Sequence, residues 1–295
     1  MGAAEGRLVT ATRTVLVTGA GGQVGRELAE VFEADPSWRL VACDRTLLDV
    51  SCRDSVLGAI TSVAPDAVVH AGAWTAVDAC EGDPHRALAV NALGTRHVAD
   101  AARRVGAHVT YLSTDYVFDG EKPGAYHEWD EPGPRSAYGT SKLGGERELD
   151  PGSTVVRTSW LFGRHGANMV KTVLRLASEG DGPLNFVDDQ HGCPTSAADL
   201  AGTIRQLVSA QLPGTFHVTN QGATTWFGLA RDVVALAGHD ADRVQPVATS
   251  ALVPPRPARR PANSVLDGAA LRLSGIPPLP DHREPLAALV AELTS

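Results

Sequence analysis

The feature that most constrains this chain is a glycine-rich turn that joins an apolar run to a helical repeat. Residues 14–18 (TVLVT) are apolar or β-branched, which predicts a short buried strand. Residues 22–34 then carry apolar side chains at helical spacing, namely Val24, Leu28, Val31 and Phe32. The turn between the two segments has glycines at positions 19, 22 and 25. A strand that leads through a tight turn into a helix predicts a βαβ unit, and therefore a parallel sheet.

The alternation of strand and helix patterns continues through the first half of the chain. Short apolar runs predict further buried strands at residues 40–43, 67–70, 109–112 and 155–157. Helical patterns predict helices at residues 51–63, 84–105 and 138–149. This order predicts the α/β fold class, with a doubly wound parallel sheet of the Rossmann type.

The alternation weakens beyond residue 160, which predicts a second and smaller unit. Helical patterns occur at residues 167–178, 196–210, 226–236 and 286–293, with one strand pattern at 215–218. Residues 246–261 are rich in proline and predict a loop that carries function. We expect residues 13–160 to form the Rossmann domain. Residues 161–295 are expected to form mainly a C-terminal α/β lobe for substrate, with later segments returning to the first domain.

Composition and charge exclude several classes of protein. The 295 residues are 43% hydrophobic and 20% charged, which is typical of a globular protein and excludes disordered and collagen-like chains. The 26 basic residues against 34 acidic ones give a net charge of −8, which argues against a nucleic-acid partner. No apolar stretch reaches about 18 residues, and residues 1–13 lack an apolar segment, so we expect neither a membrane span nor a secretory signal. The four cysteines form no CxxC pair, which predicts reduced thiols and a cytoplasmic location.

The spacing of the three glycines in the turn meets the demands of a dinucleotide site. A tight turn, a close approach of backbone to a pyrophosphate and close packing of helix on strand each favour a residue without Cβ. The N–H groups at the start of the following helix then face the phosphates. The next predicted strand ends at Asp44, whose carboxylate can accept hydrogen bonds from the adenosine ribose. Its neighbour Arg45 can instead hold a 2′-phosphate, so NADH and NADPH both stay open, and both residues also suit an ordinary turn.

Residues 138–142 (YGTSK) place a tyrosine and a lysine four positions apart in a predicted helix. Side chains at this spacing share one face, so the phenol of Tyr138 and the ammonium of Lys142 point into the same space. A tyrosine phenol titrates near ~10, and a neighbouring cation lowers its pKa, which suits acid–base chemistry. Thr114 lies at the end of a predicted strand 24 residues upstream, where ligands bind in doubly wound sheets. Its hydroxyl can donate a hydrogen bond to a substrate carbonyl.

These motifs together resemble the dTDP-4-dehydrorhamnose reductase family of the extended short-chain dehydrogenase/reductase superfamily. The resemblance runs from Val15 to Leu293 and is carried by TGAGGQVG (18–25), AWTAVDACE (73–81), STDYVFDG (113–120), YGTSKLGGE (138–146), RTSWLFG (157–163), DDQHGCPT (188–195) and RRPANSVLD (259–267). STDYVFDG, RTSW and DQxGxPT together are specific to this group, whereas the other motifs are shared more widely. The resemblance implies reduction of the C4 ketone of a dTDP-4-keto-6-deoxyhexose by NADPH or NADH, with dTDP-4-dehydro-L-rhamnose as the expected substrate.

The resemblance also implies roles for individual residues. The implied catalytic residues are Thr114, Tyr138 and Lys142, of which Lys142 also binds the cofactor ribose. The implied cofactor contacts, besides Tyr138 and Lys142, are Gly19, Gly22, Gln23, Val24, Gly25, Asp44, Arg45, Asp49, Val50, Ala71, Gly72 and Ala73. The implied contacts of the nucleotide sugar are Thr75, Val77, Thr114, Asp115, Tyr116, Trp160, Arg260 and Asn263. An arginine suits a diphosphate because its guanidinium fork matches the geometry of phosphate oxygens.

Related activities stay open at this level. Sugar 4,6-dehydratases of the superfamily follow their threonine with an Asp–Glu pair, but here Tyr116 follows Asp115, so elimination lacks its second carboxylate. The alternatives are a reductase of a related dTDP-4-keto deoxysugar in antibiotic biosynthesis (dihydrostreptose-type) and a non-catalytic regulatory subunit of the same fold. Some relatives hold Mg²⁺ at a dimer interface through a glutamate four positions after a proline, but the matching position after Pro194 is Ala198. We therefore expect no metal ligand, and either a monomer or a homodimer.

Overall fold

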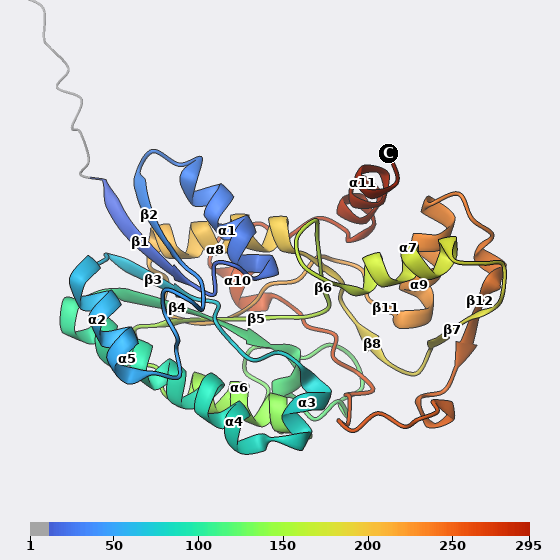
Figure 1. The fold of residues 1–295 in the computed structure, drawn as a ribbon, viewed down its shortest axis with the longest axis horizontal. Coiled ribbons are helices and arrows are strands. Elements are labelled where there is room, and N and C mark those ends of the chain that lie inside the picture. The colour runs from blue at the N-terminus through green and yellow to red at the C-terminus, as the bar shows by residue number, and fades with distance from the viewer. Residues whose placement is uncertain (1–11) are drawn as a thin grey trace, which may run out of the picture.

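Six parallel strands form the central sheet of the molecule. The structure is a computed structural model that describes residues 12–295, so the expectation for residues 1–13 lies almost entirely outside it. The strands of the sheet are β1 (Arg13–Thr18), β2 (Trp38–Cys43), β3 (Ala67–His70), β4 (His108–Thr114), β5 (Thr154–Thr158) and β10 (Gly214–His217). Their order is β10-β5-β4-β3-β1-β2, and every neighbouring pair is parallel (Figure 1). The predicted doubly wound parallel sheet is therefore confirmed.

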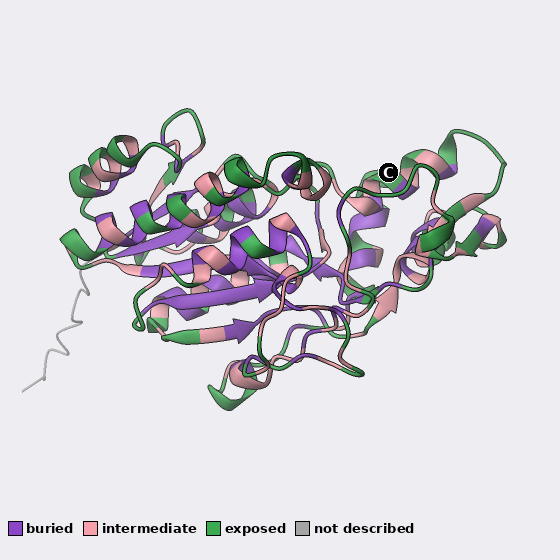
Figure 2. Cartoon of the chain, turned by 90° about the horizontal axis from the view of Figure 1, so that it is seen from below, coloured by how far each residue is buried: buried purple, intermediate pink, exposed green. Residues whose placement is uncertain are grey.

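Helices cover both faces of this sheet, which explains why most residues of β1, β3, β4 and β5 are buried. One face packs against α1 (Gln23–Glu33), α8 (Ala197–Ala210) and the short α10 (Ala269–Leu273). The other face packs against α2 (Arg53–Val63), α5 (Gly94–Val105) and α6 (Ala137–Glu146). Figure 2 shows the strands as buried between helices whose outer surfaces are exposed. Helices α8 and α10 and strand β10 come late in the chain. Segments beyond residue 160 therefore complete both the sheet and the helical layer on one of its faces.

The direction of winding changes between β1 and β3, because β2 lies on one side of β1 and β3 on the other. In open α/β sheets a ligand binds at such a switch point, beyond the carboxyl ends of the strands. The turn after β1 and the loops after β3, β4 and β5 meet there. The topology alone therefore predicts a ligand site at the carboxyl edge of the sheet.

The segment predicted as one helix over residues 84–105 is divided in the structure. It consists of α4 (Pro84–Leu88), a π-helical turn at Ala89–Leu93 and then α5, while α3 (Val77–Gly82) precedes it. Asn91 lies in the π turn and is buried, and its amide bonds the backbone of Trp74 and the hydroxyl of Ser141. Single π turns inside helices are frequent at functional sites. Here the turn connects α5 with α6 and with the loop after β3.

A smaller lobe of short strands and three helices lies beside the carboxyl edge of the sheet (Figure 1). Its helices are α7 (Met169–Ser178), α9 (Trp226–Leu236) and α11 (Arg283–Thr294), which share one apolar core. Its strands pair two by two: β6 (Leu161–Phe162) with β9 (Thr195–Ser196), β7 (Leu184–Val187) with β12 (Val244–Val247), and β8 (His191–Gly192) with β11 (Thr224–Thr225). Within residues 12–295 no helix combines the length and the apolar character that a bilayer span requires.

Candidate active site

A cavity of about 830 Å³ lies at the carboxyl edge of the sheet, where the turn after β1 meets the loops after β2, β3, β4 and β5. Twenty of the residues that the sequence assigned to cofactor, catalysis or substrate line this one cavity. They are Gly19, Gly22, Gln23, Val24, Gly25, Asp44, Arg45, Asp49, Val50, Ala71, Gly72, Ala73, Thr75, Val77, Thr114, Asp115, Tyr116, Tyr138, Lys142 and Trp160. Two others, Arg260 and Asn263, do not line it. The volume falls in the range of cofactor and ligand pockets.

The glycine turn fits the close approach of a pyrophosphate. Gly19 has φ +68°, a left-handed conformation that favours glycine, and the N–H of Gly22 donates to its carbonyl over 2.9 Å. A Cβ on Gly25 would come within 2.2 Å of the same carbonyl, so only glycine lets α1 begin this close to β1. Among the described residues no side chain caps α1 at Gly22, so the first N–H groups of the helix remain available to an anion.

The end of β2 forms the side of the cavity where an adenosine would lie. One carboxylate oxygen of Asp44 accepts bonds from the N–H and hydroxyl of Thr46, at 2.9 and 2.6 Å, which lowers the pKa of Asp44. These bonds hold Asp44 ionised in a turn, and they engage one of its two oxygens. Arg45 beside it also lines the cavity. The geometry therefore keeps a carboxylate and a guanidinium together at this end, as the sequence predicted.

The end of β4 and the first turn of α6 bring the three predicted catalytic side chains to one cavity. Thr114 is buried and donates from its hydroxyl to the carboxylate of Asp115 over 2.8 Å. Tyr138 packs edge-on against Tyr116, with ring centroids 5.6 Å apart. Lys142 donates from Nζ to the carbonyl of Leu112 over 2.7 Å. The phenol of Tyr138, the amine of Lys142 and the hydroxyl of Thr114 thus line the same cavity as the glycine turn.

Burial, and not the lysine, governs the pKa of Tyr138. Burial and the charge of Asp115 raise the pKa of the Tyr138 phenol, which the neighbouring Thr114 hydroxyl only partly offsets. Burial also lowers the pKa of Lys142 to about 7, against which Glu146 acts in the opposite direction. The expectation that Lys142 lowers the pKa of Tyr138 is therefore wrong for the chain by itself, because its Nζ bonds a backbone carbonyl in a dry site. A neutral phenol at neutral pH is the state that a proton donor needs.

A buried ion pair supports α6 from behind the catalytic face. Glu146 follows Lys142 by one helical turn and accepts two bonds from Arg157 of β5, at 2.9 and 2.7 Å. The hydroxyl of Ser113 donates to the same carboxylate over 2.5 Å. A Cβ on Gly139 would lie 2.1 Å from the carbonyl of Tyr116, so this glycine lets α6 approach the loop after β4. The last turn of α6 is thereby fixed against β4 and β5, and its first turn against the loop after β4.

Arg260 and Asn263 are the two predicted substrate residues that the structure places elsewhere. Arg260 forms a fork with Asp78 of α3, at 3.0 and 2.8 Å, and lines a separate cavity of about 340 Å³. Asn263 donates from its amide to the carbonyls of Lys122 and Gly124, at 2.8 and 2.6 Å. Their expected contact with the nucleotide sugar stays a prediction, and neither side chain lines the main cavity in this structure. The reason is local: a carboxylate takes the guanidinium, and two backbone carbonyls take the amide.

Several residues that the sequence did not single out also line the main cavity. Trp226, the first residue of α9, stacks on Trp160, and Arg86 lies over the ring of Trp74 with 4.4 Å to its centroid. Periodicity cannot find such residues, because it reports which face of a helix is buried and not which distant segment faces a cavity. The only local signal is Thr225, whose hydroxyl accepts from the N–H of Gly228 and so marks the start of α9.

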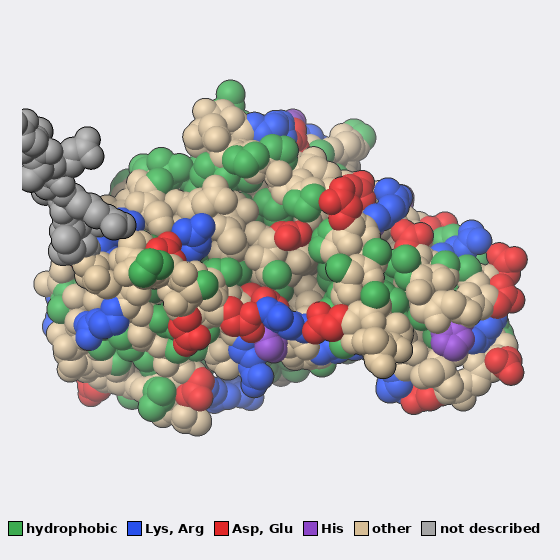
Figure 3. Space-filling view, turned by 90° about the horizontal axis from the view of Figure 1, so that it is seen from above, with side chains coloured by type: hydrophobic (Ala, Val, Ile, Leu, Met, Phe, Trp, Pro, Cys, Tyr) green, Lys and Arg blue, Asp and Glu red, His purple; other side chains and the backbone are tan. Residues whose placement is uncertain are grey.

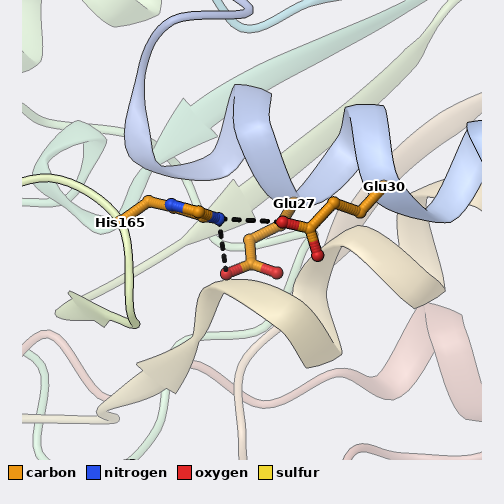
Figure 4. A group of neighbouring side chains, drawn as sticks. All are labelled: Glu27, Glu30 and His165. Atoms are coloured by element: carbon orange, nitrogen blue, oxygen red, sulfur yellow. Dashed lines mark hydrogen bonds and ion pairs between the residues drawn. The ribbon is translucent and has the colours of Figure 1, made fainter. Parts of the chain in front are cut away.

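Glu27, Glu30 and His165 gather on the outer side of α1 (Figure 4), where each offers one atom within 4.8 Å of the others. Arg164 pairs with both carboxylates, and His165 lies 2.9 Å from Glu30. Arg164 therefore compensates part of the acidic charge from within the chain. Octahedral Mg²⁺ sites instead use carboxylates with water or phosphate oxygens. The residues do not fit such a site, and Ala198 offers no ligand atom.

Charges of both signs are interspersed on the face of the molecule shown in Figure 3. The basic side chains of the proline-rich loop have acidic partners: Arg256 and Arg260 pair with Asp78, and Arg259 pairs with Glu121. The pair of Arg259 and Glu121 is exposed, so it is weak and screened by salt, whereas the fork of Arg260 and Asp78 is partly buried.

Comparison with known proteins connects this geometry to one group of enzymes. Residues 13–295 match the family described as the RmlD substrate binding domain. The chain is 43% identical to dTDP-4-dehydrorhamnose reductase of Streptomyces griseus, over 92% of this chain and 91% of that protein. It is 38% identical to the enzyme of the same name from Mycobacterium tuberculosis strain H37Rv, over 94% of this chain and 92% of that protein.

Solved structures agree with the sequence relatives. The structure of dTDP-4-dehydrorhamnose reductase from Bacillus anthracis in complex with NADP superposes with a TM-score of 0.90 at 38% identity, covering 95% of this chain and 99% of that one. A UDP-glucose 4-epimerase from Thermus thermophilus in complex with NAD is 23% identical with a TM-score of 0.80, covering 94% of this chain and 98% of that one, and it shares the fold.

Proposed function

The chain belongs to the family of dTDP-4-dehydrorhamnose reductases described by the RmlD substrate binding domain, and from this premise we propose that it reduces a dTDP-4-keto-6-deoxyhexose. The expected reaction converts dTDP-4-dehydro-L-rhamnose to dTDP-L-rhamnose with NADPH or NADH. The single observation that carries the proposal is that Thr114, Tyr138 and Lys142 line the same cavity as the glycine turn. Hydride donor and proton donor then face one carbonyl.

The cofactor site fits NAD(P)H because the backbone at Gly19 and Gly25 admits no side chain and, within residues 12–295, no side chain caps α1 at Gly22, which leaves the first N–H groups of that helix for a pyrophosphate. When bound, NAD(P)H supplies the hydride that adds to C4 of the sugar. Arg45 favours a 2′-phosphate and Asp44 favours free ribose hydroxyls, so the chain offers a contact to each form of the cofactor.

The side chains around the carbonyl supply the proton and hold the oxygen. Thr114 donates a hydrogen bond to the ketone oxygen and polarises it. Tyr138 gives its proton to the oxygen as negative charge develops there, so that ketone, hydride and proton together make the alcohol. Burial raises the pKa of Tyr138, so the phenol carries its proton at neutral pH and gives it up only as the more basic alkoxide develops. Lys142 binds the cofactor ribose. Its ammonium group then stabilises the phenolate that Tyr138 becomes after it has given up its proton.

The nucleotide sugar enters from the side of the small lobe. Thr75, Val77, Tyr116 and Trp160 face the cavity and bind the sugar and nucleotide. Arg260 reaches the diphosphate only after it exchanges Asp78 for phosphate, since its fork is occupied in the structure. We therefore divide the chain into two functional parts. Residues 13–160 with α8 and β10 mainly hold the cofactor, and the remaining C-terminal segments mainly hold the nucleotide sugar. We place the reaction in the cytoplasm, because all four cysteines are unpaired thiols.

A coupled assay tests the function directly. Keto sugar is made from dTDP-glucose by a 4,6-dehydratase, with and without a 3,5-epimerase, and NADPH or NADH oxidation is followed after this chain is added. We expect oxidation that depends on the epimerised sugar, and NMR of the product should show dTDP-L-rhamnose. Oxidation with only a differently configured sugar would assign a related deoxysugar reductase. No oxidation with any keto sugar, together with a tight complex with another protein, would assign a regulatory subunit.

A further inference from the structure

Two tryptophans from distant parts of the chain stack face to face in the main cavity. The ring centroids of Trp160 and Trp226 are 3.6 Å apart and their planes differ by 6°. Both rings are partly buried, and both line the cavity on the side of β5, which is the side away from Asp44. A centroid separation this short leaves almost no offset between the rings, whereas aromatic pairs favour offset or edge-on arrangements with centroids about 4.5–7 Å apart, so the surrounding structure holds the two indoles together.

Trp160 has an unusual backbone for such a large residue. Its φ is +48°, in the left-handed region that bulky side chains seldom adopt. Its carbonyl accepts a bond from the N–H of Thr195 over 3.2 Å, which ties this conformation to the start of β9. Backbone of this kind persists only where the surrounding structure fixes it, and it concentrates at ligand sites.

The indole of Trp160 lies in a slot with two walls. One wall is the backbone of Gly192, where a Cβ would come within 2.4 Å of the indole. The other wall is the indole of Trp226. Gly192 and Thr224 are opposite one another in the antiparallel pair β8–β11, and Trp226 follows two residues later. One small sheet therefore builds both walls.

The slot also lies close to the reacting centre. Thr158 pairs in register with Thr114 across β4 and β5, and Trp160 comes two residues after Thr158. The cavity at this point is lined by Thr114, Tyr138 and both tryptophans. An apolar ring placed here faces whatever ligand presents its carbonyl to Thr114.

We propose that Trp226 is a positioning residue of the substrate site, which fixes the indole of Trp160 so that the edge left free by Gly192 and Trp226 forms an apolar wall for the deoxysugar ring. This inference rests on the proposed function, since it takes a 6-deoxyhexose as the ligand at Thr114. Such a sugar carries a methyl group in place of the hydroxymethyl group of an ordinary hexose, and an apolar aromatic wall favours that methyl group. Trp226 acts through Trp160 and through the shape of the slot.

A purely structural role for Trp226 predicts different results. In that case its loss weakens the packing of α9 and lowers the apparent kcat through the smaller amount of folded protein, while the KM for the sugar and the KM for the cofactor both stay unchanged. A positioning role instead changes the KM for the nucleotide sugar and leaves the KM for the cofactor unchanged. An aromatic replacement that still stacks then restores the KM for the sugar.

The test compares W226L and W226F with the wild-type chain and with W129L as a matched control. Trp129 is 69% exposed and does not line the cavity. We expect W226L to raise the KM for the keto sugar about fivefold to tenfold, with the KM for NADPH within about twofold. W226F should return the sugar KM to within about twofold of wild type, and W129L should match wild type. Circular dichroism checks the stack itself, because the exciton couplet of the two indoles should vanish in W226L and in W160F and persist in W129L.

The outcomes separate this inference from the proposed function. An unchanged sugar KM in folded W226L, or equal rises in the sugar and cofactor KM, would overturn the positioning role while the reductase assignment stands. If the wild-type chain reduces no keto sugar, calorimetry with a dTDP-6-deoxyhexose and NADP⁺ gives the same comparison. A loss of affinity of about fivefold or more in W226L, rescued by W226F, then supports the positioning role; equal affinity overturns it.

Discussion

Replacing Glu146 by glutamine is expected to destabilise the chain strongly, because it leaves a buried guanidinium without its counter-ion. The side chains of Arg157 and Glu146 are 5% and 8% exposed, and Arg157 donates two bonds to the carboxylate. In the variant an amide NH₂ group faces one of the guanidinium donors, and the charge of Arg157 stays buried. Breaking a buried pair from one side typically costs about 3–5 kcal/mol.

A surface pair on the same helix end provides the control. Glu148 accepts a fork from Arg96 at 2.7 and 2.7 Å, but the side chain of Arg96 is 53% exposed. Because solvent screens this pair, Glu148→Gln should cost less than about 1 kcal/mol. The two forks have similar hydrogen-bond lengths, so the difference between the variants measures the effect of burial.

Urea unfolding followed by tryptophan fluorescence gives the free energies for Glu146→Gln and Glu148→Gln, for Glu146→Leu and Arg157→Met alone, and for Glu146→Leu combined with Arg157→Met. The double variant replaces the ion pair by apolar side chains of similar size, so we expect it to recover most of the loss. The reasoning is refuted if Glu146→Gln costs no more than Glu148→Gln, or if the double variant is as unstable as the sum of its single changes.

Three further changes test other parts of the structure. Burial raises the pKa of the Asp115 carboxyl from 3.8 to about 6, so the folded chain binds the carboxyl proton more tightly than the unfolded chain does. The stability that this proton contributes is present below about pH 3.8 and is lost as the pH rises through about 6. Asp115→Asn should therefore raise the free energy of unfolding at pH 8 by about 1–3 kcal/mol relative to wild type, and by much less at pH 4; an equal effect at both pH values would contradict this. Arg45→Ala should raise the KM for NADPH about tenfold and leave the KM for NADH within about twofold, whereas equal changes would exclude a contact to the 2′-phosphate. Gly25→Ala should abolish NAD(P)H binding in a fluorescence titration, because its Cβ would meet the Gly19 carbonyl at 2.2 Å, and wild-type affinity would show that the turn can relax.

The parallel sheet and its helices could be predicted because their signals are local. The strand at Ala67–His70 and the helix at Trp226–Leu236 have the bounds that the apolar patterns indicate. The pattern over residues 84–105 is helical throughout, and no periodicity reveals that Asn91 sits in a π turn. That turn depends on bonds from Asn91 to Trp74 and Ser141, which are distant in sequence.

The small lobe was harder to predict because its strands are two to four residues long. The pairs β6–β9 and β8–β11 consist of two residues each, which is too short for an alternating pattern. Their positions follow from tertiary packing. The same limit explains why Trp226 was missed, since it reaches the cavity only through the pairing of β8 with β11.

The cofactor end of the cavity could be predicted in detail, and the diphosphate end could not. The turn from Gly19 to Gly25 is set by its own backbone, so the residues identify it without tertiary information. The partner of Arg260 depends on which acidic side chain lies within reach, and that is Asp78, far away in sequence. The effect of burial on Tyr138 and Lys142 likewise depends on packing that no spacing of residues reveals.

The central claim is that Tyr138 gives a proton to the sugar oxygen in a site that Thr114 and Lys142 complete. Steady-state kcat for reduction of the keto sugar by Tyr138→Phe tests it most directly, with Tyr126→Phe as a control whose phenol bonds Asp119 outside the cavity. The account predicts that kcat falls by about 10²–10⁴-fold in Tyr138→Phe, with an intact fold and cofactor binding, while the control keeps wild-type kcat. A Tyr138→Phe enzyme that turns over at the wild-type rate would contradict it.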